Sequence, residues 1–278
     1  MQKHAIDYLM LGHFTRDLLP DGSVTPGGTA LYAALAAERL GQSVGVVSAP
    51  AALPDDWPAD IQISFRPELS PPTFENRYTP QGRLQILHTD SGEISLDDVP
   101  SSWRTAPIVH LGPVAAETPE ALVKAFPDAL LGVTPQGWMR VWGKLPGPIS
   151  YRVWQPSVEL LRRIDALVLS IEDVHGDEEL VRGYARECPL VALTRGAQGA
   201  TLFVRGEAHS VAAYPANESD PTGAGDVFAA ALLVRLYETK DPFMAAKFAA
   251  CVAAASVEGR GASTIPRRSS VEERMCWD

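Results

Sequence analysis

The stretch that decides the fold is Asp220-Pro221-Thr222-Gly223-Ala224-Gly225-Asp226, followed directly by VFAAALLVRL at 227–236. Two glycines around one alanine permit a close backbone approach. The following residues are good helix formers without Gly or Pro. A glycine-rich turn that opens a helix directs free N–H groups and the positive end of the helix dipole at one point. The stretch therefore predicts an anion site, with phosphate as the usual anion.

Asp226 gives this predicted anion site a second meaning. A carboxylate beside bound phosphate repels it, so its presence is explained if it takes a proton from a hydroxyl that attacks the phosphorus. The alternative is structural: Thr222 caps the helix, and Asp226 is a first-turn acid that suits the dipole. These residues alone leave both interpretations open.

Length and composition describe an ordinary globular chain. It has 278 residues, 46% hydrophobic and 21% charged, enough to bury one large core or two modest ones. The formal net charge of −10 argues against a nucleic-acid partner, which needs clustered Lys and Arg on one face. The three cysteines lack any C-x-x-C spacing and indicate reduced thiols.

Hydropathy bears on the cellular location. The first residues carry one lysine and a short apolar run broken by polar residues, which is not a signal-peptide pattern. The sequence also has no apolar span of about 18 residues. We therefore expect a cytoplasmic protein with no membrane partner.

The N-terminal segment predicts a ligand contact at Asp17. Residues 6–12 form a short apolar run typical of a buried strand, and Asp17 follows it closely. In a parallel sheet, ligands gather beyond the carboxyl ends of the strands. A carboxylate there can accept two hydrogen bonds from neighbouring hydroxyls. The alternative is a solvated loop acid.

A second glycine pair, Gly27-Gly28, opens an Ala-rich segment that predicts a helix ending at Gly41. Its structural alternative is a tight turn with close helix packing. Further on, Thr194, Arg195, Gly196 and Gly199 lie between two strand-like runs, and this bare G-x-x-G spacing is a weak hairpin signal.

Strand-like and helix-like segments alternate through the middle and the C-terminal half. This alternation predicts a three-layer α/β/α fold with a mostly parallel sheet covered on both faces. We expect strands at 108–111, 130–133, 166–169 and 190–194, and helices at 119–126, 177–187, 242–256 and from 269. Short alternating runs at 61–66, 73–79 and 83–89 predict a small antiparallel flap.

Polar residues follow two of these expected strands. Arg140 lies past a strand end, where a guanidinium can fork onto phosphate oxygens, although a lone arginine is more often a surface cation. Ser170, Glu172 and Asp173 offer the oxygen ligands that a hard cation prefers. The alternative is a solvated acidic helix start, and the sequence does not choose between Glu172 and Asp173.

These motifs, in this order, resemble the ribokinase-like (PfkB) family of sugar and nucleoside kinases. The family signature D-x-x-G-x-G-D matches 220–226. The resemblance implies that Asp226 is the catalytic base and that the amides of Gly223, Ala224 and Gly225 form the anion hole for the γ-phosphoryl group. It also implies substrate contacts at Asp17, Gly27 and Gly28.

The resemblance extends to the donor side. It implies ATP as the donor and Mg²⁺ as the metal, and it allows a monovalent cation. Asp173 or Glu172 would organise the metal. The nucleotide would contact Thr194, Arg195, Gly196, Gly199, Ser170 and Gly261. The pattern Gln136…Arg140-Val141-Trp142 is similar to that of the myo-inositol-kinase branch, with Gln136 on the substrate side and Arg140 as a clamp.

Two positions depart from the family pattern. Tyr32 occupies the place of an Asn that follows the glycine pair, and Thr134 replaces an acid. An ordinary ribose or fructose contact is therefore in doubt, and a cyclic polyol such as myo-inositol is favoured. The alternatives are a nucleoside kinase of the same family and a catalytically silent sugar- or nucleotide-binding protein on the same fold.

The resemblance covers nearly the whole chain and predicts its organisation. We expect a single kinase domain over 1–278, with a short β lid drawn from about 13–26 and 61–90. The expected activity is ATP-dependent phosphorylation of a hydroxyl on a small polyol or sugar. In the family such a lid covers the sugar and often forms a dimer contact, so a homodimer through the lid is also expected.

Overall fold

The structure is a computed structural model that describes residues 5–66, 69–79 and 82–276. Its centre is a nine-stranded sheet in the order β16-β15-β14-β13-β9-β8-β1-β4-β5. The strands are β1 (Tyr8–Leu11), β4 (Val44–Ser48), β5 (Gln62–Phe65), β8 (Ile108–Leu111), β9 (Leu130–Val133), β13 (Ala166–Ser170), β14 (Leu190–Thr194), β15 (Ala200–Val204) and β16 (Glu207–Val211).

Most of this sheet is parallel, as expected. Every pairing from β5 through to β14 is parallel, and only β15 and β16 join in antiparallel register. The central strands β1 and β8 are buried at every position, which explains why they appear in the sequence as continuous apolar runs. The carboxyl ends of the parallel strands therefore meet at one edge.

The sheet separates two apolar cores, because alternate residues of one strand point to opposite faces. Tyr8 and Met10 of β1 pack in one core, and Leu9 and Leu11 in the other. The first core is covered by α1 (Thr29–Arg39), α4 (Ala224–Thr239) and α5 (Pro242–Ser256), with α4 in contact with both others. The second is covered by α2 (Val158–Arg163) and α3 (Glu178–Ala185). The expected three-layer α/β/α arrangement is confirmed.

One expected helix is replaced by a shorter element. The segment 119–126 forms the 3-10 helix η3 (Glu120–Lys124) instead of an α-helix. Pro119 precedes it and Pro127 follows closely, and a residue before proline disfavours the helical conformation. Further 3-10 helices are η1 (Leu96–Asp98), η2 (Ser101–Trp103), η4 (Pro135–Met139) and η5 (Gly196–Gln198).

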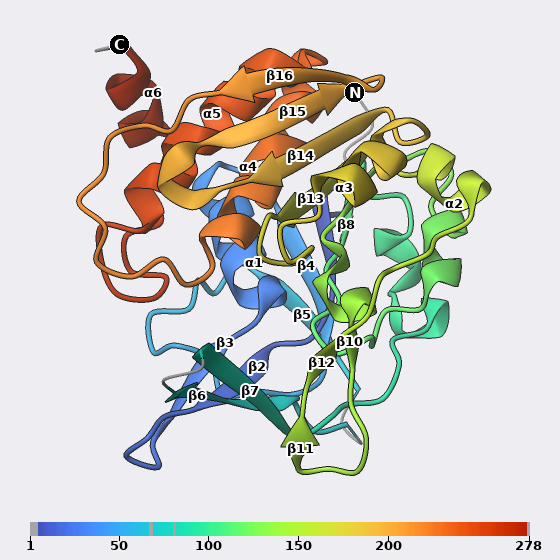
Figure 1. Cartoon of the computed structure of the whole chain (residues 1–278), viewed down its shortest axis with the longest axis vertical. Coiled ribbons are helices and arrows are strands. Elements are labelled where there is room, and N and C mark those ends of the chain that lie inside the picture. Colours follow the sequence, from blue (N-terminus) through green and yellow to red (C-terminus); the bar gives the residue numbers. More distant parts are fainter. Residues whose placement is uncertain (1–4, 67–68, 80–81, 277–278) are drawn as a thin grey trace.

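A second sheet forms the lid at one end of the molecule (Figure 1). Its order is β11-β7-β6-β2-β3, and its strands are β2 (Thr15–Leu18), β3 (Val24–Gly27), β6 (Thr73–Thr79), β7 (Gly82–Thr89) and β11 (Gly147–Pro148). Two more short strands, β10 (Arg140–Val141) and β12 (Ser150–Tyr151), pair separately.

The lid differs from the expected 13–26 and 61–90 in two places. The segment 61–66 does not belong to it, since β5 pairs in parallel with β4 at the edge of the large sheet. In the other direction, β11 adds to the lid by pairing with β7, a contact between segments far apart in the sequence. Residues 67–68 and 80–81 of the expected lid lie outside the described residues.

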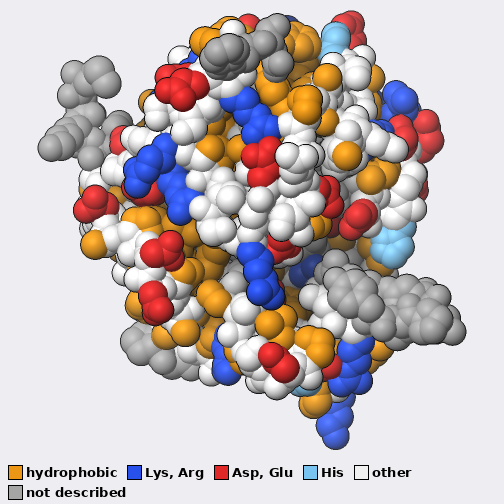
Figure 2. Space-filling view, turned by 90° about the vertical axis from the view of Figure 1, so that its left-hand side faces the viewer, with side chains coloured by type: hydrophobic (Ala, Val, Ile, Leu, Met, Phe, Trp, Pro, Cys, Tyr) orange, Lys and Arg blue, Asp and Glu red, His pale blue; other side chains and the backbone are white. Residues whose placement is uncertain are grey.

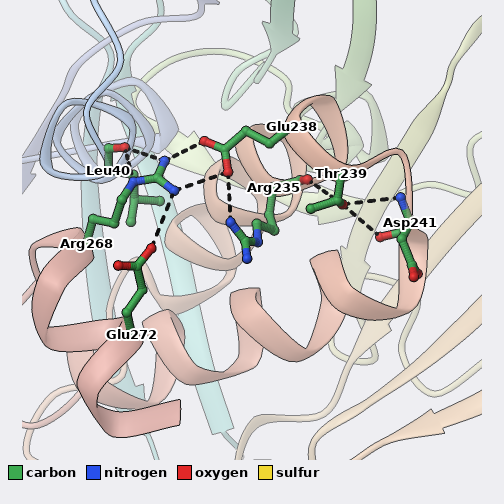
Figure 3. A network of polar contacts seen from close by, with 7 residues as sticks. All are labelled: Leu40, Arg235, Glu238, Thr239, Asp241, Arg268 and Glu272. Carbon is green, nitrogen blue, oxygen red and sulfur yellow. Dashed lines mark hydrogen bonds and ion pairs between the residues drawn. The ribbon is translucent and has the colours of Figure 1, made fainter. Parts of the chain in front are cut away.

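The C-terminal helix α6 (Arg268–Cys276) lies at the opposite end of the molecule from the lid (Figure 1). Arg268 donates hydrogen bonds to the carbonyl of Leu40, at the end of α1, at 2.6 and 2.9 Å. It also pairs with Glu238 of α4, which in turn accepts from Arg235 (Figure 3). One guanidinium thus fastens the C-terminal segment to two core helices.

The exterior has no single dominant character on the face that Figure 2 presents, where acidic, basic and apolar side chains are intermixed. Among the described residues, no helix combines the length and the low charge needed to cross a bilayer.

Candidate active site

The candidate residues gather at the carboxyl edge of the large sheet. Gln136 follows β9, Asp173 follows β13, and Thr194 is the last residue of β14. Asp17 lies in β2, a few residues beyond the end of β1. Because these strands are parallel, their loops lie on the same side of the sheet, where ligands of such folds bind.

Helix α4 begins at this edge with the glycine turn. Gly223 is its N-cap and has φ +78°, a conformation that favours glycine. A Cβ on Gly223 would lie 2.3 Å from the ring of Tyr32 in α1, whereas one on Gly225 would meet nothing within 4 Å. The start of α4 is therefore fixed against α1, and Gly225 faces open space.

One of the three amides that we expected in the anion hole already donates a hydrogen bond within the turn. The N–H of Ala224 donates to the carbonyl of Pro221 at 3.2 Å. This long bond is of the kind that closes a turn, and it competes with a ligand for the amide. The arrangement leaves the open side of Gly225 as the clearest approach for an anion.

Asp226 lies in the first turn of α4 and remains partly accessible. The pKa of this carboxyl is raised to about 6, chiefly by burial and also by the charge of Asp173, while the Thr29 hydroxyl and Arg140 act to lower it. The hydroxyl of Thr29 donates a hydrogen bond to it. Asp226 is therefore mostly ionised at neutral pH and close to its midpoint, the condition that suits a general base.

Tyr32 connects the base to the acceptor side. Burial and then the charges of Asp17, Asp226 and Asp220 raise the pKa of its hydroxyl above the ordinary value. These three acids come from the lid, from α4 and from the motif turn. Their shared influence on one hydroxyl places them around a common region.

The glycine pair serves the approach of Asp17. A Cβ on Gly27 would lie 2.7 Å from Oδ2 of Asp17, and a Cβ on Gly28 would lie 2.7 Å from the carbonyl oxygen of His13. Gly28 also has φ +90°. The hydroxyl of Thr15 donates to Asp17 Oδ1 at 3.2 Å. Only glycines allow the acid-bearing strand to lie this close to the start of α1.

Asp173 is held by a reciprocal turn. Its Oδ2 accepts from the Ser170 amide at 2.8 Å, and the Ser170 hydroxyl accepts from the Asp173 amide at 3.1 Å. The side-chain amide of Gln136 donates to Asp173 Oδ1 at 2.9 Å. Gln136, which we expected on the substrate side, is thus engaged with the acid. Glu172 is exposed, so Asp173 is the acid whose charge acts on Asp226.

Arg140 lies between the sheet edge and the lid. Its Nη1 donates to the carbonyl of Val114 at 2.7 Å, and its guanidinium carbon lies 5.4 Å from the ring centroid of Phe74 in β6. Its charge also reaches Asp226. The cation therefore sits close to the predicted base, with part of its donor capacity already used.

The donor loop after β14 is less prepared for a nucleotide than the resemblance implies. Arg195 pairs with Glu178 at 3.1 Å and contacts the Thr201 hydroxyl at 3.4 Å, so its guanidinium is committed to α3 and β15. Gly199 has φ +82°, and a Cβ there would lie 2.2 Å from the Val211 carbonyl. This glycine is required by packing. Thr194 makes one long contact, 3.5 Å to the Leu169 carbonyl, and Gly196 is exposed with φ +54°.

Gly261 supports the motif from the C-terminal side. Its N–H donates to Asp220 Oδ2 at 2.9 Å, while the Thr222 amide donates to Oδ1 at 3.0 Å. Burial acts to raise the pKa of Asp220, but these hydrogen bonds and the charge of Arg260 outweigh it and hold the pKa below the usual value. Gly261 therefore steadies the turn that begins the signature.

The structure adds residues that the sequence interpretation did not include. Thr29, directly after the glycine pair, bonds the predicted base. In the lid, Gln85 donates to the Asn76 side chain at 3.2 Å. Asn76 lies two residues after Phe74 in β6, so both side chains are on the same face of the strand. This is the face whose Phe74 ring contacts Arg140. Polar residues on one face of an alternating strand are the signal that could have indicated them.

Comparisons with known proteins agree with this arrangement. Residues 168–268 match the pfkB family carbohydrate kinase description. A fructokinase of Escherichia coli is 27% identical over 266 residues, which are 83% of this chain and 84% of the relative. A ribokinase of Bacillus subtilis is 39% identical over 84 residues, 30% of this chain and 29% of its own length. A protein of Pyrococcus horikoshii named as a sugar kinase is 42% identical over 84 residues, 30% of this chain and only 27% of its length.

Solved structures extend the likeness over the whole fold. A pyrophosphate-dependent kinase in the ribokinase family, complexed with a pyrophosphate analog and myo-inositol, superposes with a TM-score of 0.77 at 23% identity, over 96% of this chain and 99% of that one. The Arabidopsis thaliana ribokinase complexed with ribose and ATP gives 0.71 at 21%, over 98% and 99%. With the strand order, these solved structures show that the chain has the ribokinase-like fold, and its residues 168–268 are similar to the pfkB family of carbohydrate kinases.

Proposed function

We propose that the chain is a phosphotransferase that moves a phosphoryl group onto a hydroxyl of a small polyol or sugar. The observation that carries the proposal is Asp226: a carboxylate with a pKa of about 6 at the start of α4, near Arg140 and bonded by Thr29. A group with this pKa removes a proton from an alcohol effectively near neutral pH.

The proposed mechanism follows from the position of these groups. Asp17 and the lid hold the acceptor so that one hydroxyl lies beside Asp226. Asp226 takes the hydroxyl proton as the oxygen attacks the terminal phosphorus of the donor, and the bond from that phosphorus to the bridging oxygen breaks, so that ADP leaves from ATP or phosphate leaves from pyrophosphate. The amides near Gly225 and the helix dipole stabilise the transferred group, and Arg140 clamps its oxygens.

The family resemblance implies Mg²⁺. The side chains near the proposed donor position fit an ion that the protein would hold with few of its own ligands. The described residues contain no group of three or more His, Cys, Asp or Glu arranged to hold a metal ion. Mg²⁺ is commonly bound by one or two carboxylates, water and donor phosphates, which fits this situation. Asp173 would supply the protein carboxylate, and the ion would neutralise charge on the phosphates. A monovalent cation stays a prediction.

The acceptor that we favour is a cyclic polyol of the myo-inositol kind. Tyr32 replaces the family Asn beside the acceptor, and its bulky ring packs on Gly223. A solved relative with the same fold is described in complex with myo-inositol. A nucleoside kinase remains the second candidate, because a nucleoside kinase of Methanocaldococcus jannaschii shares the fold with a TM-score of 0.71.

The phosphoryl donor is the second open choice. We propose ATP, from the resemblance of the Thr194–Gly199 loop. Pyrophosphate is the alternative, supported by two pyrophosphate-dependent relatives with TM-scores of 0.77. The committed guanidinium of Arg195 adds to that support, because it takes from the loop a cation that a nucleotide would use.

A donor-by-acceptor matrix tests the proposal. Purified protein is offered ATP or pyrophosphate with Mg²⁺, in combination with myo-inositol, other polyols, sugars and nucleosides, and phosphorylated product is measured directly. Acceptor-dependent product with Asp226-dependent turnover supports the kinase. Donor binding without product for any acceptor supports the silent sugar- or nucleotide-binding protein. Size measurement in the same preparation tests the proposed homodimer through the lid.

A further inference from the structure

A buried carboxylate lies outside the residues discussed so far. Glu117, in the loop after β8, is 1% exposed. Its Oε1 accepts from the backbone amides of His13 and Val114, both at 3.0 Å. Its Oε2 accepts from the amides of Val114 at 3.0 Å and Ala115 at 2.7 Å. These donors are all backbone N–H groups. A buried carboxylate only accepts hydrogen bonds, so such donors satisfy it.

These amides belong to the two segments that flank the acceptor. His13 begins the turn that leads into β2 and Asp17. Val114 offers its carbonyl to Arg140 Nη1 at 2.7 Å. One carboxylate therefore holds two segments: through the His13 amide the segment that carries Asp17, and through the Val114 and Ala115 amides the segment whose carbonyl supports Arg140.

The backbone beside Glu117 shows that the loop depends on its surroundings. Ala116 has φ +58°, which a residue with a Cβ adopts only when the neighbouring structure enforces it. The amides on one side of Ala116 are bound to the Glu117 carboxylate, and the Glu117 carbonyl accepts from Ile94 at 2.7 Å. The loop is thus fixed from both sides, without a helix or strand of its own.

We propose that Glu117 is a positioning residue that sets the placement of Arg140 relative to Asp17 and so determines acceptor binding. The proposal rests on the proposed phosphotransfer. Its physical content is that a carboxylate can accept from three different amides at once, whereas an amide side chain would turn an NH₂ group toward N–H donors.

Glu117→Gln is the main test, with Glu120→Gln as the matched control. Glu120 is the first residue of η3, three positions after Glu117, and accepts from the indole N–H of Trp154 at 2.7 Å, a contact that involves neither Val114 nor the Asp17 segment. We expect Glu117→Gln to raise the acceptor KM and lower kcat, each by about tenfold, with the donor KM within about twofold of the original value. Glu120→Gln should leave all three constants within about twofold.

A double-mutant cycle separates positioning from loss of folded protein. In an Arg140→Ala background, Glu117→Gln should lose most of its effect on kcat, because the clamp that it supports is gone, and should keep its effect on the acceptor KM, which acts through the Asp17 segment. A purely structural role would reduce the active fraction equally in both backgrounds and leave KM unchanged. Glu117→Asp, which keeps the charge but shortens the reach, should give an intermediate acceptor KM if Glu117→Gln does not fold.

The outcomes distinguish this proposal from the proposed function. If the unmodified protein phosphorylates no acceptor, the phosphotransfer proposal fails first. If it is active and the acceptor KM of Glu117→Gln or Glu117→Asp stays within about twofold of its value, the positioning role is overturned and phosphotransfer stands. Failure of both variants to fold would also overturn it, since Glu117 would then be needed for the fold alone.

Discussion

At the scale of single residues, the chemistry depends on how Asp226 is surrounded. Burial disfavours its charge, and Asp173 adds to that effect, while Thr29 and Arg140 stabilise the charged form. Burial has the larger influence, so the pKa of Asp226 is raised to about 6. This raised pKa of Asp226 affects catalysis, the pH dependence of activity and the stability of the fold.

Replacing Asp226 by Asn should reduce turnover by about 10²–10⁴-fold, the usual effect of losing a general base. Binding of donor and acceptor should persist, because the isosteric amide leaves the shape of the site unchanged. Initial rates under saturating substrates check the first statement, and calorimetric titration with the acceptor checks the second. A variant that retains most of its turnover would refute the base assignment.

The same substitution should stabilise the fold at neutral pH. The folded pKa of about 6 lies above the ordinary aspartate value of 3.8, so the folded protein binds the proton more tightly than the unfolded chain. Ionised Asp226 therefore costs stability as the pH rises from about 4 to above 6, up to about 3 kcal/mol before discounting for its partial exposure. Thermal melting of Asp226→Asn should show a higher Tm at pH 7.5 and little difference near pH 4.

The activity should rise with pH through the region near 6, because Asp226 acts in its deprotonated form. Thr29→Val removes a hydrogen bond that lowers the pKa of Asp226, so this limb should move to higher pH. The shape of the side chain is nearly unchanged. Measurement of kcat/KM against pH for both proteins checks the shift, and an unmoved or lowered midpoint would contradict it.

At the scale of elements, the start of α4 is the critical feature. Gly223→Ala would place a Cβ 2.3 Å from the ring of Tyr32 at φ +78°, so we expect it to destabilise the protein by about 2 kcal/mol or more. Gly225→Ala meets nothing within 4 Å and should be neutral or stabilising by up to about 1 kcal/mol. Denaturant titration measures the free energy of unfolding of both variants. If Gly223→Ala and Gly225→Ala change it equally, α4 is not fixed against α1.

Elements with a strong local pattern could be predicted from the sequence, and elements defined by distant contacts could not. The helix at 242–256 and the strand at 108–111 appear with the expected bounds, because continuous apolar composition determines them. The 61–66 segment alternates like a lid strand but pairs with β4, and β11 has only two residues. Strand pairing is a nonlocal property, which alternation alone does not specify.

The candidate site also contains features that local sequence predicts and features that depend on distant contacts. The glycine turn at 220–226 could be recognised from the residues as the start of a helix, because such turns have a local chemical meaning, whereas Asp17 is singled out through the family resemblance. The engagement of Gln136 with Asp173 and of Arg195 with Glu178 could not, since each joins loops far apart in the sequence. Which donor groups are already used by the fold is a tertiary fact.

At the scale of the whole molecule, Arg268 fastens the C-terminal segment to the core (Figure 3). Arg268→Ala should lower the free energy of unfolding by about 1–3 kcal/mol, because the Leu40 carbonyl and Glu238 lose charge-assisted bonds. Kinetic constants should stay unchanged, since the contacts lie at the far end of α1. Glu272→Gln is the control: its 4.0 Å pair with Arg268 is exposed and worth less than about 0.5 kcal/mol.

This network also has a direction in pH. Burial alone would raise the pKa of Glu238, but Arg268 and Arg235 outweigh it and hold the pKa below the usual value. A depressed carboxyl pKa contributes stability above the unfolded value, and that contribution is lost as the pH falls through the folded value. The Tm difference between the original protein and Arg268→Ala should therefore narrow in acid.

The connection between lid and core carries a last consequence. Only Gly28 separates β3 of the lid from α1, and the first residue of α1 is Thr29, which bonds Asp226. A displacement of β3 when an acceptor binds would therefore reach Thr29 within two residues. The Thr29 hydroxyl lowers the pKa of Asp226, so its position affects the proton affinity of the proposed base. We therefore expect an acceptor bound under the lid to change the proton affinity of Asp226, a change that water alone would not bring about.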